Sequence, residues 1–321
     1  MAAILLTGVL AAAPAAAREP APAAVVDFSS WLERLRQAST QRNYEGTVVH
    51  QAAGQLSSAR VSHFNNGSEH VERLDALDGR ARQVYRRNES VQTLWPDARV
   101  AIIEQRDAGD QASVLWRAAP SARAQMNYEM QVLGQGRVAG HDAVIVMLTP
   151  RDALRFAQRL WTERSSGLLL RTEVLASDGG VLESATFTDL QLDIRAPAQA
   201  MVAPDNYRIV KPQQAPTTLE AQGWVLAEVA GFVPVRCVKR VAHPDARGAK
   251  QEMVQAVFSD GLTQVSVFIE AFSAQVHRPL AGGMGATQTL SQRRGPWWIT
   301  ILGDVPAPTL GQFSAALERR R

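Results

Sequence analysis

Cysteine is almost absent from this chain of 321 residues. Cys237 is the single one, so no disulfide can form within the chain. It stands in a strand-like run between Val235 and Val238, where a lone cysteine is more often a small buried hydrophobe than a reactive thiol. A chain of this length can bury a large core without disulfides, so the scarcity of cysteine does not argue against export.

Lysine is also scarce. Only 3 lysines stand beside 31 arginines, and the 31 acidic residues bring the formal net charge to +3. The arginine excess has two interpretations: genomic base composition, or forked recognition of carboxylate and phosphate groups. No basic stripe of the kind that binds nucleic acid is present, so nucleic acid is not an expected partner.

Long apolar runs are missing. The run Ala2–Ala13 is shorter than the roughly 20 residues that a membrane-spanning helix needs. Small residues at 15–17 fit a cleavage site, so we predict a signal peptide over 1–17 and a mature chain from Arg18. No Lys or Arg precedes the apolar run, which leaves the true start codon open. No cysteine follows the run, which excludes a lipid anchor there.

Sequence motifs of catalysis are missing as well. The chain contains neither the G-x-S-x-G of a nucleophile elbow nor the H-E-x-x-H of a zinc enzyme. The glycines at 134, 136 and 140 miss the dinucleotide spacing, and Gly282–Gly285 lacks the Lys of a phosphate loop. We therefore predict no catalytic residue, no cofactor and no enzymatic activity.

Two groups of histidines need separate consideration. His63 and His70 flank the turn at 65–67 and would approach each other in a hairpin. We favour a surface pair over a metal site because a third ligand is not evident, and we predict no metal. His141 and Asp142 follow Gly140, and we interpret them as turn residues rather than as a catalytic dyad.

The first regular element is expected to be a helix. Ser30 and Glu33 have the spacing of a capping box, and the helix should end near Gln41–Asn43. Its apolar residues share one face, as in a helix that covers a core. They are Trp31, Leu32, Leu35 and Ala38.

Short strands separated by turns follow from Tyr44 onward. Asn65–Gly67 and Asp78-Gly79 are hairpin turns, and a three-stranded meander is expected over 156–190. Strands at this spacing predict a large antiparallel sheet that curls, with the helix against its concave side. We also expect one helical turn at Pro150–Ala153 and a loop with a short helix over 107–124.

Four prolines mark the boundary between two domains. They lie within 196–218, a stretch of little periodicity that we predict to be a linker. Residues 18–26 form a flexible lead-in, 27–195 the large domain, and 219–321 a smaller domain. The smaller domain should end in an amphipathic helix at about Thr309–Glu318.

A curled sheet with a helix at its mouth can enclose an apolar cavity for a lipid. The alternative is ordinary core packing, which strand alternation alone does not distinguish from a cavity. The residues expected to point inward are Val48, Val61, Val84, Leu94, Ile102, Val144, Val146 and Leu170.

An ordered set of short motifs runs along nearly the whole mature chain, and only the set, not any one motif, is specific. The motifs are 43–47 (NYEGT), 69–74 (EHVERL), 137–140 (RVAG), 150–152 (PRD), 159–161 (RLW), 166–170 (SGLLL), 258–262 (FSDGL), 266–270 (SVFIE) and 303–306 (GDVP). In this order they resemble the RseB/MucB family of periplasmic regulators.

The resemblance implies an α+β fold that is mainly antiparallel β. The large domain would be an unclosed β-barrel with helices at its opening, similar to LolA and LolB, and the small domain would be α+β. The protein would act in the periplasm, bind the periplasmic domain of a membrane-bound anti-sigma factor and shield it from regulated proteolysis. Lipid or lipopolysaccharide would release it. A periplasmic lipid or lipoprotein carrier is the alternative, and an unrecognised hydrolase is a distant third.

For the partner-binding surface we select the dense motif of the small domain, namely Phe258, Asp260, Leu262 and Phe268. The competing interpretation is that Phe258 and Phe268 are core residues. The sequence leaves the oligomeric state open, a homo-oligomer included.

Overall fold

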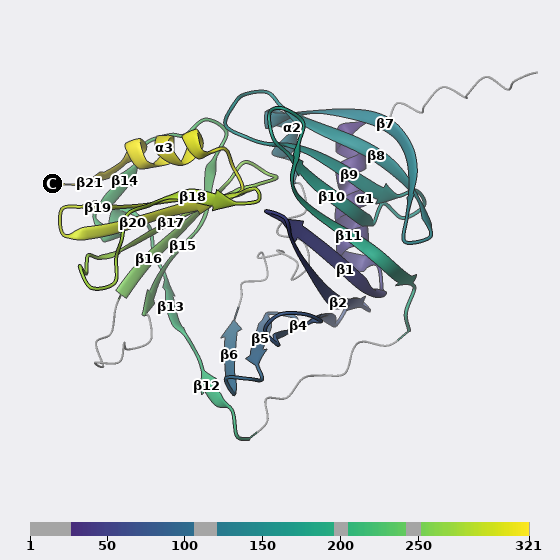
Figure 1. Ribbon diagram of the computed structural model, residues 1–321, viewed down its shortest axis with the longest axis horizontal. Coiled ribbons are helices and arrows are strands. Elements are labelled where there is room, and N and C mark those ends of the chain that lie inside the picture. Colours follow the sequence, from purple (N-terminus) through teal and green to yellow (C-terminus); the bar gives the residue numbers. More distant parts are fainter. Residues whose placement is uncertain (1–26, 106–120, 196–204, 242–251, 321) are drawn as a thin grey trace, which may run out of the picture.

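Two large sheets and one small two-stranded sheet organise the described part of the chain (Figure 1). The computed structural model describes residues 27–105, 121–195, 205–241 and 252–320. The predicted signal peptide (1–17), the lead-in up to residue 26, the loop at 107–120 and the start of the predicted linker (196–204) lie outside these ranges. Among the described residues, no helix is long and apolar enough to cross a bilayer.

Helix α1 (Phe28–Gln41) begins one turn earlier than its capping box suggests. Its N-cap is Asp27, whose carboxylate accepts a hydrogen bond from the Ser30 backbone N–H at 3.1 Å. Ser30 is therefore inside the first turn, and the prediction of a Ser30 cap is wrong. The predicted apolar face is confirmed, because Trp31, Leu35 and their neighbours on that face are all buried.

The larger sheet has 12 strands in the order β12-β6-β5-β4-β3-β2-β1-β11-β10-β9-β8-β7. All pairs are antiparallel except that of β12 with β6. The strands are β1 (Tyr44–Ala52), β2 (Gln55–Asn65), β3 (His70–Ala76), β4 (Gln83–Arg87), β5 (Ser90–Trp95), β6 (Val100–Gln105), β7 (Tyr128–Val138), β8 (His141–Pro150), β9 (Ala157–Glu163), β10 (Leu169–Leu175), β11 (Val181–Leu192) and β12 (Arg208–Val210).

This sheet curves around α1 and stays open, because its outermost strands, β12 and β7, do not pair with each other (Figure 1). The buried face of α1 and the concave face of the sheet share one apolar core, which includes Leu35, Val146, Leu160 and Phe187. The predicted fold class is confirmed: the domain is an unclosed antiparallel sheet with a helix against it.

The prediction of a helical turn at Pro150–Ala153 is wrong. Pro150 is the last residue of β8, and the chain continues as an irregular loop to Arg155. The Asp152 carboxylate accepts a hydrogen bond from the Leu154 backbone N–H at 3.0 Å, which stabilises this loop. A short helix, α2 (Ala124–Asn127), precedes β7.

The turn between β9 and β10 is organised by Glu163. Its carboxylate accepts hydrogen bonds from the backbone N–H groups and hydroxyls of both Ser165 and Ser166, at 2.6–3.1 Å. Burial opposes ionisation of Glu163, but these donors outweigh it and lower its pKa to about 2.

This shift predicts a pH-dependent contribution of Glu163 to stability. A carboxylate with a lowered pKa in the folded chain stabilises folding above its ordinary pKa of 4.5, and the contribution disappears as the pH falls towards 2. We expect Glu163→Gln to be less stable than the parent at pH 7, with the gap closing between about pH 4.5 and 2. Urea unfolding across this pH range measures it. The S165A/S166A variant should differ in stability from the parent by less than Glu163→Gln does over the same pH range. A stability difference between Glu163→Gln and the parent that does not change with pH would contradict the assignment.

The small domain contains a seven-stranded antiparallel sheet in the order β13-β15-β16-β17-β20-β19-β18. Helix α3 (Ala307–Ala316) covers it, close to the predicted terminal helix, and β14 (Trp224–Leu226) pairs with β21 (Leu317–Arg319). A 3-10 turn (Glu220–Gln222) precedes β14. The strands of the sheet are β13 (Gln213–Pro216), β15 (Val233–Val241), β16 (Glu252–Ser259), β17 (Gln264–Ala271), β18 (Leu280–Met284), β19 (Thr287–Arg294) and β20 (Trp297–Gly303).

The connection between the domains carries two strands. β12 lies parallel to β6 at the edge of the large sheet, and β13 lies antiparallel to β15 at the edge of the small sheet. Gln214 Nε2 also donates to the Gln105 backbone carbonyl at 3.1 Å. This segment, predicted as a linker, is therefore attached to both sheets.

Candidate functional site

The two domains meet at a buried contact, which we call the domain interface. The large domain contributes α2, the first residue of β7 and the loop at 151–155, and the small domain contributes the loops at 229–232 and 259–263. In Figure 1, α2 marks this contact at one end of the boundary, and β12 lies at the other end.

Asp260 is the centre of the domain interface. Its Oδ2 accepts from Arg155 Nε at 2.7 Å and from the Tyr128 hydroxyl at 2.9 Å. Its Oδ1 accepts from the backbone N–H groups of Leu262 and Thr263 at 2.8 and 2.7 Å. The side chains of both Asp260 and Arg155 are fully buried. The Oδ1 of Asp260 thus stabilises the turn that contains Asp260, and its Oδ2 binds residues of the large domain.

The other two nitrogens of the Arg155 guanidinium also have partners. Nη2 donates to the Ala230 backbone carbonyl at 2.7 Å, Nη1 pairs with Asp152, and the guanidinium lies 4.7 Å from the centre of the Phe232 ring. Burial, with the adjacent Asp260 carboxylate, raises the pKa of Tyr128 well above its ordinary range, so its hydroxyl remains a donor.

Two glycines let the domains approach closely. Gly231 and Gly261 have φ of +77° and +101°, and a Cβ on either would collide with the large domain. At Gly261 the collision would be with the backbone N of Ala124, next to the Ser121 N–H that donates to the Gly261 carbonyl at 2.7 Å. The interface requires glycine at both positions.

The residues selected for partner binding lie in different surroundings. Asp260 is at the domain interface, Leu262 belongs to the core of the large domain, and Phe258 belongs to the core of the small domain. Phe268, on β17, is half-buried. The sequence interpretation did not identify their counterparts, which are Arg155, Tyr128 and Asn127. The Asn127 side-chain amide donates to the Asp260 backbone carbonyl at 2.7 Å. The only available signal was the 150–152 motif, which ends three residues before Arg155.

Seven of the eight residues selected for a lipid cavity are in phase with the concave face under α1, and Leu94 is not. Val48, Val61, Val146 and Leu170 are buried in the core that contains the helix, and Val84 and Val144 pack against it. Ile102 on β6 is half-buried and in phase with Val84, because both pair with Thr93. Leu94 on β5 is buried but pairs with Gln83, so it points to the opposite face of the sheet and its selection as an inward residue is wrong. The helix fills the space over the first six, so a lipid can reach them only if α1 moves.

A cavity that the sequence interpretation missed lies in the small domain. Its volume is about 590 Å³, and aromatic rings from Phe232, Phe258 and Phe313 line it together with aliphatic residues of β15. Phe313 packs edge-on to Phe232, with ring centres 5.3 Å apart. Such a lining suits an apolar group.

Cys237 also lines this cavity and is half-buried. Burial raises the pKa of its thiol from 9.0 to about 11, and the negative charge of Glu220 adds to the shift. The thiol is therefore protonated at neutral pH, as expected for a small hydrophobe rather than a nucleophile.

We expect native Cys237 to react with iodoacetamide at pH 8 at least about tenfold more slowly than in the urea-unfolded chain. A pKa higher by about two units lowers the thiolate fraction about 100-fold, and the greater nucleophilicity of a more basic thiolate recovers about tenfold. Mass spectrometry of timed samples measures both rates, with free N-acetylcysteine as the control for reagent activity in urea. Equal rates in the two states would contradict the predicted shielding.

The predicted hairpin at His141 and Asp142 is confirmed, but the two residues begin strand β8 and are not themselves in the turn. Ala139 and Gly140, with φ of +48° and +84°, form the two-residue turn between β7 and β8. The His141 Nε2 donates to the Leu190 backbone carbonyl at 3.2 Å. This contact fastens the hairpin to β11.

The large domain is an open sheet around one helix, and a buried ion pair fixes it to a second domain that has its own apolar cavity. This architecture is that of a two-domain binding protein. The sequence matches the MucB/RseB N-terminal domain over residues 27–206 and the MucB/RseB C-terminal domain over residues 218–318. The chain belongs to the MucB/RseB family, whose members are regulatory binding proteins and not enzymes.

Relatives and solved structures agree with this assignment. The chain is 30% identical to the sigma factor AlgU regulatory protein MucB of Pseudomonas aeruginosa, over 98% of this chain and 96% of that protein. It is 24% identical to the sigma-E factor regulatory protein RseB of Haemophilus influenzae, over 87% of each chain. A structure of the Pseudomonas aeruginosa MucA/MucB complex matches with a TM-score of 0.69 and 26% identity, over 91% of this chain and 99% of that chain.

Proposed function

We propose that this protein is a periplasmic negative regulator that binds the periplasmic domain of a membrane-bound anti-sigma factor and shields it from regulated proteolysis. Lipid or lipopolysaccharide then releases it. The observation that carries the proposal is the similarity to the MucB of the MucA/MucB complex, which extends over both domains. A bare carrier sheet would lack the second domain and the interface that fixes it.

The domain interface supports a binding surface made by both domains. Phe258, Asp260 and Leu262 are buried, so in this proposal they act by fixing the orientation of the small domain. Of the four residues selected for partner binding, Phe268 is the one that is only half-buried. In this proposal it contacts the partner directly. A partner that contacts both domains would bind their fixed arrangement more tightly, because less orientational freedom is lost on binding.

Release by lipid requires that lipid and partner favour different states of the chain. In this proposal an acyl chain enters the concave face, displaces α1 and contacts Val48, Val61, Val84, Val144, Val146 and Leu170, with Ile102 further along the same face. Arginines beside the concave face supply donors for phosphate groups. Arg34 on α1, which donates to the backbone carbonyls of Arg164 and Ser165, would be freed by the movement of the helix.

The test is a calorimetric titration of the mature chain from Arg18 with the periplasmic domain of the same organism's anti-sigma factor, repeated with lipopolysaccharide. Tight binding that lipopolysaccharide weakens supports both parts of the proposal. Absence of binding in either condition discards the regulator and leaves the lipid carrier as the better candidate, which transfer of bound lipid to a membrane acceptor then tests.

Two variants localise the effects. Phe268→Ala should weaken partner binding, whereas Val276→Ala, on an exposed loop of the same domain, should leave it unchanged.

Trp31 on α1 is buried, with its indole N–H directed at the Thr162 hydroxyl (3.4 Å), so its fluorescence reports on displacement of the helix. A lipopolysaccharide-induced fluorescence change that is the same in Trp31→Phe as in the parent would argue against entry under α1.

A further inference from the structure

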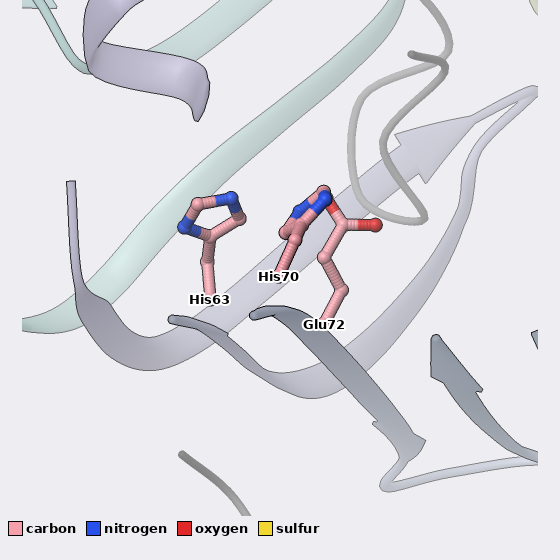
Figure 2. A group of neighbouring side chains, drawn as sticks. All are labelled: His63, His70 and Glu72. Carbon is pink, nitrogen blue, oxygen red and sulfur yellow. The ribbon is translucent and has the colours of Figure 1, made fainter. Parts of the chain in front are cut away.

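We propose that His63, His70 and Glu72 form a binding site for a divalent transition-metal ion, with Zn²⁺ the best match. The three side chains converge from β2 and β3 in Figure 2, and one potential ligand atom from each lies within 4.8 Å of the other two. Two imidazoles and one carboxylate are a donor set that zinc accepts, with water in the fourth position.

The strand register brings these residues together. His63 pairs with Glu72 across β2 and β3, and His70 precedes Glu72 by two residues, so both β3 side chains point to the same face. That face is the concave one, because Val61 and Leu74, in phase with them on the same strands, belong to the core under α1. The site therefore lies at the polar end of the concave face.

His63 presents a lone pair into the cluster. Its Nδ1 lies 2.6 Å from the Arg42 backbone carbonyl, which can only accept, so Nδ1 carries the proton and the neutral ring has an unprotonated Nε2. His63 is 1% exposed, and its Nε2 is buried without a hydrogen-bond partner.

The second imidazole, that of His70, lies beside the first. The rings of His70 and His63 have centres 4.9 Å apart, and the His70 Nε2 is also buried without a hydrogen-bond partner. It lies 3.6 Å from Glu72 Oε1, a separation close to that between two ligands of one zinc ion. Zinc bonds of about 2.0–2.1 Å place two ligand atoms about 3.3 Å apart, so the His63 ring must approach by up to about 1.5 Å.

The surroundings contain one further charge. Arg86 lies opposite Glu72 in the register of β3 and β4 and is buried, so it opposes a cation at the cluster. Its Nε donates to the Asn88 backbone carbonyl at 2.9 Å. Tyr44 stacks on His63 with ring centres 5.3 Å apart, which fixes the ring without adding charge. With Arg86 nearby, we expect micromolar rather than nanomolar affinity.

These observations correct the sequence interpretation of a surface pair. His63 is buried rather than on the surface, and the third ligand is Glu72, two residues after His70. The signal was present, since alternate residues of a strand share a face. A bound ion would link the β2–β3 hairpin through His63 to Arg42, the residue that ends α1.

The experiment titrates Zn²⁺ into the tag-free mature chain by calorimetry after treatment with EDTA and dialysis. We expect one ion per chain, and His70→Ala and Glu72→Gln should each weaken binding by about tenfold or more. The matched control is His50→Ala. His50 Nε2 lies 2.7 Å from Glu183 Oε1 and offers one imidazole with one carboxylate, so its loss should leave the affinity unchanged.

Co²⁺ gives an independent measurement, because its visible absorption reports nitrogen ligation and low coordination number. The parent chain should develop this spectrum, and His70→Ala should lose it while keeping the parent's circular dichroism. Substoichiometric Zn²⁺ binding, or an affinity that neither His70→Ala nor Glu72→Gln changes, would overturn the proposal. Since neither assay involves the anti-sigma factor or lipid, the outcome is independent of the proposed regulatory function.

Discussion

Asp260→Ala is expected to lower the free energy of unfolding by about 3–5 kcal/mol and to loosen the contact between the two domains. Removal of the carboxylate leaves the Arg155 guanidinium as a fully buried charge without its Asp260 partner. The Tyr128 hydroxyl and the backbone N–H groups of Leu262 and Thr263 lose their acceptor at the same time. Each orphaned buried donor adds its own desolvation cost.

Urea unfolding measures the free energy, and small-angle scattering measures the separation of the domains through the radius of gyration. Glu33→Ala is the control, because its pair with Arg36 is about half exposed on both sides and such pairs contribute little to stability. If Asp260→Ala is no more destabilising than Glu33→Ala, Asp260 does not hold the domains together.

A double substitution separates the ion pair from the hydrogen bonds. Replacing both members of a buried pair by apolar residues is often neutral, so Arg155→Met with Asp260→Leu should recover part of the lost stability. Full recovery is not expected, because Leu262 N, Thr263 N and the Tyr128 hydroxyl still lack an acceptor. If the double variant is no more stable than Asp260→Ala, the loss of these hydrogen bonds, and not the unpaired charge, accounts for most of the destabilisation.

Phe313→Ala is expected to destabilise the small domain by about 3–5 kcal/mol, the cost of a large buried ring. Phe313 is fully buried, contacts Phe232 and Phe258 with ring centres 5.3 and 5.4 Å away, and fixes α3 to the sheet. The vacated space adjoins the existing cavity of about 590 Å³, so collapse of the neighbours should recover little of the loss.

Chemical denaturation gives the free energy for Phe313→Ala, and hydrogen exchange localises the loss to residues of the small domain. Val276→Ala removes a side chain that is 70% exposed, and it should change stability by no more than about 0.5 kcal/mol. A loss spread evenly over both domains would mean that Phe313 acts through the domain interface rather than through the local core.

Local patterns in the sequence were enough to place many elements. The apolar face of α1 and the hairpin at Asn65–Gly67 depend on residues a few positions apart, and both predictions are confirmed. Asn66 Oδ1 accepts from the N–H groups of Ser68 and Glu69, as such a turn requires. The helix start was misplaced because Asp27 and Ser30 are both good caps and the sequence alone did not decide between them.

Contacts between distant residues were not predictable in the same way. Asp260 stands in a Ser-Asp-Gly turn, which predicts an exposed side chain, and half of its role does follow that pattern. Its second oxygen binds Arg155, 105 positions away, and the sequence of the turn does not predict this contact. Alternation likewise assigned Val61 and Val146 to the inner face but did not show that α1 fills the space above them.

The strands β12 and β13 were not predicted, because proline is rare inside strands and the prolines of the connecting segment indicated a linker instead. Pro216 is tolerated because β13 is an edge strand, and Pro212 falls between the two strands.

The placement of β12 and β13 has a consequence for self-association. An open edge of a sheet presents unpaired N–H and C=O groups on which a strand of another molecule can add, and from there chains aggregate. β12 occupies such an edge beside β6, and β13 occupies one beside β15. The segment that joins the domains therefore also caps one edge of each sheet. A protease cut that released it would leave each sheet with a newly exposed edge on which a strand of another molecule could pair.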